Sequence, residues 1–373
     1  MTRPAAHDIL FDPVALGPVK ARNRFAAVPH CIGTRDPAVH AAYRGRRAAG
    51  GWAVVCTGYC SVHPEADDSP YQQVRLWDDG HVRDLALMTG AVHEHGALAG
   101  VELWFGGLTG RPGRGRGVSA MVSDQSAGRS VWAMTRAEIA ELRGFYVAAA
   151  KRALAAGFDL VLIGAQEADN IICEFLMPAY NRRADEYGGP LRNRARFLCE
   201  VLEDVRAVTG DRAALGVRLC VDTLDGTPEG IRAGTEGRRI IGLAGPLADF
   251  WDVQAGGWLS ARWGTDPEPG SPENSRAPYL RAIRGATTRP VIAAGRFTSP
   301  DVMAEVIRSG QQAMIGAARP SIADPDMPAK IEAGEPVHPC TGGNLCVDRI
   351  AAALPVRCGR NPGAGLEHAR RTS

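Results

Sequence analysis

The chain has 373 residues, 45% of them apolar, enough to bury the core of one long barrel or of two smaller domains. Its 43 basic and 41 acidic residues leave a net charge of +2, so attraction to nucleic acid or to an anionic membrane is not expected. Nine scattered cysteines argue against a secreted disulfide framework, and no apolar run could span a bilayer, so we expect a reduced, cytoplasmic protein.

Short apolar runs alternate with amphipathic helical segments along the whole chain. We expect eight buried strands, near residues 23–30, 53–59, 98–104, 159–164, 214–219, 248–254, 290–294 and 312–316. Because each is followed by a helical segment such as 136–156, the pattern predicts an α/β fold, a closed (β/α)₈ TIM barrel. No GxGxxG motif follows the first strand, so a doubly wound dinucleotide-binding domain is not indicated.

Residues 105–135 form a stretch rich in Gly, Arg and Ser after the third expected strand. In a barrel this loop overhangs the face where the carboxyl ends of the strands meet. Two alternatives stay open for the stretch, a lid over the site or a disordered connection.

Polar and aromatic residues stand at the expected carboxyl ends of the strands, where barrels carry their chemistry. In chain order these ends carry Cys31, Tyr59, Glu102, Trp104, Gln166, Arg218, Gln254, Gly295, Arg296 and Gly316. After the last two strands, Gly295 and Gly316 allow the backbone to approach a phosphate, and Arg296 and Arg319 supply positive charge. These two strand ends therefore predict a phosphate site.

Longer motifs resemble the old yellow enzyme family of FMN flavoproteins (NADH:flavin oxidoreductases). FLMPAYNRRADEYGGPLRNRARF (175–197) is similar to the family's most specific motif, and LFDPVALGPVKARNRF (10–25) resembles its opening hairpin and first strand. Finer features are similar to the flavin domain of the trimethylamine, dimethylamine and histamine dehydrogenase branch: VPHCIG (28–33), GWAVVCTGYCSVHPEADD (51–68), GALAGVELWFGG (96–107) and ARPSIADP (318–325). The resemblance implies an N-terminal hairpin and an FMN-binding barrel over residues 1–335, followed by a cysteine-containing extension over 336–373.

The resemblance also implies roles for cofactor residues. Cys31, preceded by Pro29 and His30, matches the cysteine that is bonded through sulfur to carbon 6 of the flavin in this branch. Glu102 matches a polar residue at the pyrimidine edge of the flavin. Arg218 matches an arginine near flavin N1 and O2, where a cation stabilises the anionic reduced cofactor.

Three cysteines in the extension match an iron–sulfur motif with one ligand replaced. The branch binds a [4Fe–4S] cluster through a CxxCxxC run and a fourth cysteine, and Cys340, Cys346 and Cys358 match three of these positions. Gly343 stands in place of the second ligand, although such clusters usually have four thiolates. The sequence leaves open whether a cluster is retained on three thiolates or the site is decayed.

Four residues of the expected substrate site show where this chain departs from trimethylamine dehydrogenase. Tyr59 and Trp263 match two walls of its aromatic bowl for a methylated ammonium group, but the third wall is Ile350. Gln166 replaces the family's histidine and cannot act as an acid or base, whereas Asp266 matches that histidine's acidic partner. We expect Tyr59, Gln166, Trp263 and Asp266 to form the catalytic site, with a substrate other than trimethylamine.

The leading interpretation is an FMN-dependent oxidoreductase that transfers a hydride from a carbon next to nitrogen, or a related substrate, to flavin N5. Two alternatives stay open: an NAD(P)H-dependent ene-reductase, and a non-catalytic flavin or cluster subunit that relays electrons. Relatives in the branch continue into two nucleotide-binding domains, so we expect a separate electron-accepting or nucleotide-binding subunit or another electron partner. We expect a small-molecule substrate and a homo-oligomer. We do not expect a nucleic-acid or a membrane partner.

Overall fold

The barrel strands coincide with the eight apolar runs of the sequence. The structure is a computed structural model that describes residues 3–66, 73–109, 113–123, 128–166, 170–256 and 272–372. Its barrel strands are β3 (Phe25–Ala27), β4 (Val54–Ser61), β6 (Leu98–Trp104), β10 (Leu160–Ala165), β11 (Ala214–Asp222), β12 (Phe250–Ala255), β13 (Val291–Ala294) and β14 (Met314–Ala317). They pair in parallel, and β3 pairs with both β14 and β4, which closes the barrel. The predicted (β/α)₈ fold is confirmed.

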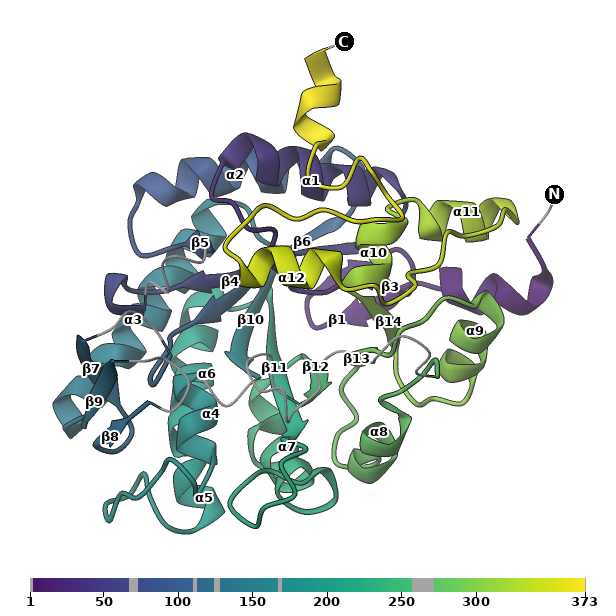
Figure 1. Ribbon diagram of the computed structural model, residues 1–373. Helices are drawn as coiled ribbons and strands as arrows, with labels where there is room; N and C mark the ends of the chain where they lie inside the picture. The colour runs from purple at the N-terminus through teal and green to yellow at the C-terminus, as the bar shows by residue number, and fades with distance from the viewer. Residues whose placement is uncertain are drawn as a thin grey trace.

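Helices surround the strands (Figure 1). The longer ones are α1 (Pro37–Ala49), α2 (Gly80–His93), α3 (Arg136–Ala155), α6 (Arg196–Thr209) and α9 (Pro300–Arg308). Shorter helices are α4 (Ile171–Leu176), α5 (Leu191–Arg194), α7 (Arg238–Ala244), α8 (Ala277–Ile283), α10 (Arg319–Ala323), α11 (Met327–Ala333) and α12 (Leu345–Ala351). Short 3₁₀ segments are η1 (Ala5–Phe11), η2 (Pro64–Ala66), η4 (Gly245–Leu247) and η5 (Glu367–Thr372), and η3 (Ala233–Gly237) is a π-helical turn.

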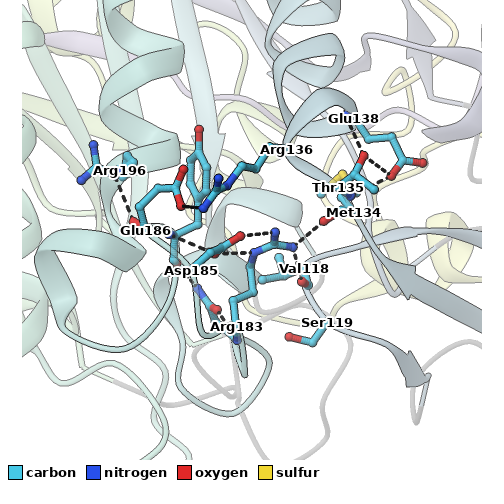
Figure 2. A network of polar contacts seen from close by, with 12 residues as sticks. Val118, Ser119, Met134, Thr135, Arg136, Glu138, Arg183, Asp185, Glu186 and Arg196 are labelled. Carbon is cyan, nitrogen blue, oxygen red and sulfur yellow. Dashed lines mark hydrogen bonds and ion pairs between the residues drawn. The ribbon is translucent and has the colours of Figure 1, made fainter.

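Side chains cap the amino ends of two long helices of the barrel, α1 and α3. Asp36 accepts hydrogen bonds from the backbone N–H groups of Ala38 and Val39, and Pro37 opens α1, where its missing N–H costs nothing. Thr135 and Glu138 form a capping box at the start of α3 (Figure 2). Among the described residues, no helix is long and apolar enough to cross a membrane.

The amino end forms the predicted hairpin. β1 (Val14–Leu16) pairs antiparallel with β2 (Val19–Ala21). Gly17 turns between them at a φ of 56°, a conformation that favours glycine. One further short strand, β5 (Val74–Arg75), extends the edge of β4.

The Gly/Arg-rich stretch after β6 is ordered in its described part. β7 (Gly113–Gly117), β8 (Met121–Val122) and β9 (Arg129–Ala133) form a three-stranded sheet with β9 in the middle. Disorder, one of the two alternatives from the sequence, is therefore wrong for these residues.

The family motif at 175–197 holds this small sheet in place. Arg183 donates to the carbonyl oxygens of Val118, at 3.1 Å, and Met134, at 2.6 Å, and pairs with Asp185 at 2.6 Å (Figure 2). Ser119 accepts a hydrogen bond from the backbone of Arg182. These contacts give the motif a structural role, because they tie the loop after β10 to the connection after β6.

In the C-terminal extension, α12 lies over the barrel, and η5 lies beyond α1 (Figure 1), where Glu367 pairs with Arg47. Val356 donates its backbone N–H to Ile32 at 2.9 Å, and Asn361 donates to the carbonyl of Ile322 at 2.8 Å. Ile32, Tyr43, Ile322, Cys346, Ile350, Val356 and Ala364 form a small apolar cluster of their own. The extension is thus packed onto the loops after β3 and β14.

Candidate active site

A cavity of about 1610 Å³, its mouth included, lies over the carboxyl ends of the barrel strands. All nine predicted cofactor residues line it: Pro29, His30, Cys31, Glu102, Arg218, Gly295, Arg296, Gly316 and Arg319. Tyr59, Gln166, Cys340, Cys346 and Ile350 line the same cavity. Trp263 and Asp266 lie outside the described residues.

The backbone before Cys31 is held by two arginines. Arg218 donates to the carbonyl of Pro29 at 2.9 Å, and Arg44 donates to the carbonyl of His30 at 2.5 Å. Gly58 leaves room for the thiol, because a Cβ at Gly58 would lie 3.0 Å from Cys31 Sγ. Cys31 is therefore fixed in position at the cavity wall.

His30 is a partly buried, neutral histidine. Its Nδ1 lies 2.7 Å from the carbonyl oxygen of Val28 and donates to it, so Nε2 is left to accept from Arg44 and from the Tyr43 hydroxyl, each at 3.0 Å. Burial and then the charge of Arg44 hold the pKa of His30 well below its usual value. This side chain therefore positions the loop and does not exchange protons near neutral pH.

Arg218 stands between two buried carboxylates. It lies 3.2 Å from Asp252 and 3.8 Å from Glu102, which are 1% and 2% exposed. Burial raises the pKa of Asp252, and Arg218 and the hydrogen bond from Gln254 oppose that shift. Asp252 was not among the residues predicted from the sequence. The available signal was a carboxylate inside an otherwise apolar strand, two positions before Gln254.

The ends of β13 and β14 form the opposite part of the cavity. A Cβ at Gly316 would lie 2.9 Å from the backbone carbon of Ala293, so a larger residue does not fit. Arg296 has a φ of 57°, a strained conformation for a residue with a side chain. Arg319 donates to the Asn344 side chain at 2.6 Å and so connects this end of the cavity to the extension.

These groups fit FMN. Two arginines beside two glycines suit a phosphate, and Arg218 with Glu102 suits the polar edge of a flavin ring. Gln166 is 5% exposed, and its amide oxygen has no hydrogen-bond partner among the described residues. A buried polar atom of this kind at the wall of a cavity suits a hydrogen-bond donor on a second ligand, bound beside the cofactor.

An aromatic pair lines the remaining part of the cavity. The Tyr59 and Trp104 ring centroids lie 4.7 Å apart with an interplanar angle of 36°. Val347 and Ile350 on α12 add apolar surface. The sequence placed Trp104 at a strand end but gave it no role, because the pair forms only when the ends of β4 and β6 come together.

The three cysteines of the extension do not form an evident metal site. Cys340 and Cys346 line the cavity, and Cys358 packs beside the apolar cluster of the extension. Within the described ranges, no three His, Cys, Asp or Glu side chains are grouped so that they could hold a metal ion. Only three thiols are present, since Gly343 stands at the second ligand position, so the donor set does not fit a four-thiolate cluster.

A closed barrel whose strand ends surround a cavity with two arginines beside glycines and a buried arginine–carboxylate group defines the class, a flavin-dependent barrel oxidoreductase. Residues 9–338 match the NADH:flavin oxidoreductase / NADH oxidase family, and the chain belongs to this family. Membership supports FMN as the cofactor and confirms the resemblance seen in the sequence.

The chain is similar to amine dehydrogenases. It is 42% identical to dimethylamine dehydrogenase of Hyphomicrobium sp. (strain x), over 99% of this chain and 52% of that protein. It is 31% identical to a metal reductase of Desulforamulus reducens, over 96% of this chain and 54% of that protein. The chain thus spans about half the length of these curated relatives.

Solved structures show the same likeness. The 6-hydroxypseudooxynicotine amine oxidase of Pseudomonas geniculata N1 superposes with a TM-score of 0.92 and 36% identity, over 99% of this chain and 56% of that one. Histamine dehydrogenase of Rhizobium sp. 4-9 gives a TM-score of 0.89 and 37% identity, over 97% of this chain and 53% of that one.

Proposed function

We propose that the protein is an FMN-dependent amine oxidoreductase that oxidises the carbon next to nitrogen in a substrate other than trimethylamine. The observation that carries this proposal is the single cavity that brings Cys31, Glu102 and Arg218 together with the aromatic pair Tyr59 and Trp104. Dimethylamine dehydrogenase, at 42% identity, supports an amine as the substrate.

The residues divide the cavity into a cofactor part and a substrate part. FMN, when bound, supplies the hydride acceptor. Gly295, Arg296, Gly316 and Arg319 would hold its phosphate, and Glu102 and Arg218 its polar ring edge. We propose that Cys31 is the attachment point of a covalent flavin, supported by its fixed position beside Gly58.

On the substrate side, the chain's own groups orient the amine and exclude water. Tyr59 and Trp104 offer aromatic surface, which holds an alkyl or cationic group by packing and cation–π attraction. Gln166 can hold a substrate by hydrogen bonding but cannot accept a proton at neutral pH. In our proposal the catalytic set is Tyr59, Gln166, Trp263 and Asp266, with any proton transfer assigned to a group other than Gln166.

The role of the C-terminal extension and the partners of the protein are also proposals. Cys340, Cys346 and Cys358 are proposed as the remaining positions of a cluster site, and we derive no step through a cluster. An electron-accepting or nucleotide-binding partner, whether a domain or a subunit, is supported by relatives about twice as long as the sequence described. A homo-oligomer and a cytoplasmic location stay predictions.

An anaerobic titration of the FMN-loaded protein tests the function. Dimethylamine, histamine and longer secondary amines are added separately, with NADPH as the competing donor, and flavin absorbance is followed. We expect bleaching by at least one amine. Bleaching by NADPH alone would favour an ene-reductase, and no bleaching by any donor would favour an electron-transfer subunit.

A matched pair of variants checks the aromatic part of the site. Trp104→Phe removes part of the surface against Tyr59 and should slow reduction by the best amine. Trp77→Phe makes the same change outside the cavity and should not. Equal rates in the two variants would exclude Trp104 from the substrate site.

A further inference from the structure

We propose that one wall of the cavity selects amines whose second arm carries an uncharged hydrogen-bond donor, such as a hydroxyl group. This wall, the neutral wall, consists of Trp104, Thr109 and Gln166. The inference rests on the proposed amine oxidation and adds the substrate class to it.

Two buried polar atoms of the neutral wall have no partner. Thr109 is 9% exposed and Gln166 5% exposed, and both line the cavity. Neither Thr109 Oγ1 nor Gln166 Oε1 has a hydrogen-bond partner in the part of the chain that the structure describes. Buried polar atoms in native proteins are normally satisfied, so two of them beside one cavity indicate a ligand that supplies their partners.

The backbone brings the two atoms to the same side of the cavity. Thr109 follows β6 and Gln166 follows β10, and these strands are neighbours in the barrel. Their loops are also bridged, because Gly106 pairs with Asn170 and Ile171 donates its N–H to the carbonyl of Phe105 at 3.0 Å. The two loops that carry the neutral wall are thus neighbours at the cavity.

The chemistry of these atoms specifies the ligand. The Gln166 amide oxygen only accepts hydrogen bonds and the Thr109 hydroxyl can accept one, so the matching group is a donor. Both side chains are uncharged, and the carboxylate of Glu102 near Gln166 already faces Arg218 at 3.8 Å, which favours a hydroxyl or N–H group over a second ammonium group. The Trp104 ring, 3% exposed, offers apolar surface for the methylene groups of the arm.

The substrate expected from this wall is a secondary amine larger than dimethylamine. A ligand that displaced water from the wall without supplying a donor would leave Thr109 and Gln166 unsatisfied, at a cost in affinity. Dimethylamine is too small to carry a donor on a second arm. We therefore expect it to bind more weakly than an amino alcohol.

Calorimetric binding to the FMN-loaded protein under anaerobic conditions tests the inference with isosteric pairs. N-methylethanolamine is compared with N-methylpropylamine, and methylaminobutanol with N-methylpentylamine, so that a hydroxyl replaces a methyl group in each pair. For at least one pair, we expect the alcohol to bind about tenfold more tightly. N-methylethylenediamine, which carries a second ammonium group, should bind more weakly than N-methylethanolamine.

Two variants test whether the neutral wall causes the preference for the alcohol over the alkyl amine. Thr109→Val and Gln166→Met remove the two polar groups at nearly constant volume, and each should reduce the alcohol preference to about twofold or less. Thr227→Val makes the same change at an exposed threonine outside the cavity and should keep the preference.

Three results would overturn the inference: no preference for either alcohol, a preference that survives both wall variants, or tighter binding of the diamine. Failure of the proposed function is seen separately, in flavin absorbance. Selective binding of the alcohol with no bleaching by any amine would support the neutral wall and reject amine oxidation.

Discussion

Arg218 and Asp252 are register partners on the neighbouring strands β11 and β12, and their side chains lie 3.2 Å apart. Burial nevertheless raises the pKa of Asp252 despite the nearby guanidinium group. The loss of hydration of this carboxylate therefore outweighs the attraction of Arg218, as is common for buried ion pairs. The pair is held at a cost in stability, and its benefit is the position of Arg218 at the cavity.

Asp252→Asn should therefore be at least as stable as the parent protein at neutral pH. The pKa of Asp252 in the folded state lies above its value in the unfolded chain, about 4, so the folded state binds this proton more tightly. The stability that this contributes is present below the unfolded pKa and is lost as the pH rises through the folded pKa. The advantage of the variant should thus grow as pH rises from about 4 to neutrality. Urea denaturation across this range measures it.

The exposed substitution Asp211→Asn is the matched control and should show no such pH-dependent difference. A variant that is less stable than the parent at neutral pH, by a margin that grows with pH, would show that the ion pair is net stabilising.

Much of the fold follows from local sequence patterns. The apolar runs around Ala26 or Val161 are short, flanked by helical segments and buried along their length, so strand positions and barrel closure were predictable. The proposed cofactor residues share one cavity because all strand ends of a barrel meet at one face, whereas their individual roles rest on the family resemblance. The residues of β7 to β9 gave no such signal, since a Gly/Arg-rich segment lacks apolar alternation.

The remaining site features depend on contacts between distant segments. Tyr59 meets Trp104 only through the pairing of β4 with β6, and Asp252 meets Arg218 only through the register of β11 with β12. The packing of Ile350 at the cavity requires the extension to fold back onto the barrel. No local pattern encodes these contacts.

Cys31 is expected to carry FMN covalently. A thioether survives acid, so acid precipitation of the purified protein should leave the yellow colour in the pellet. Cys31→Ala should release it to the supernatant, whereas Cys199→Ala, on α6 away from the cavity, should not. Colour released from the parent protein would show that FMN is bound non-covalently.

Gly343→Cys is expected to increase the iron content of the extension. A Cβ at Gly343 would have only the Thr341 hydroxyl within 4 Å, at 3.8 Å, so a thiol has room there and completes a four-thiolate set. Anaerobically purified Gly343→Cys protein should approach about four irons per chain and exceed the parent. Cys346→Ala should lower the iron content of both.

Gly359→Cys is the matched control for this prediction, because it adds a thiol to the same extension in open space. Two results would reject residue 343 as the missing ligand position. One is an iron content in Gly343→Cys that does not exceed that of the parent, and the other is an equal iron content in Gly343→Cys and Gly359→Cys.

Ile350→Trp is expected to strengthen the binding of tetramethylammonium, a cation that cannot react. Ile350 lines the cavity but has no aromatic face, and one aromatic contact to a cation contributes about 0.5–2 kcal/mol, up to about thirtyfold in affinity. Perturbation of the flavin spectrum measures binding. Ile350→Leu controls for the change of shape, and thermal unfolding checks that the larger side chain is accommodated. Equal or tighter binding by the parent protein, with Ile350→Trp folded, would show that residue 350 does not face the bound cation.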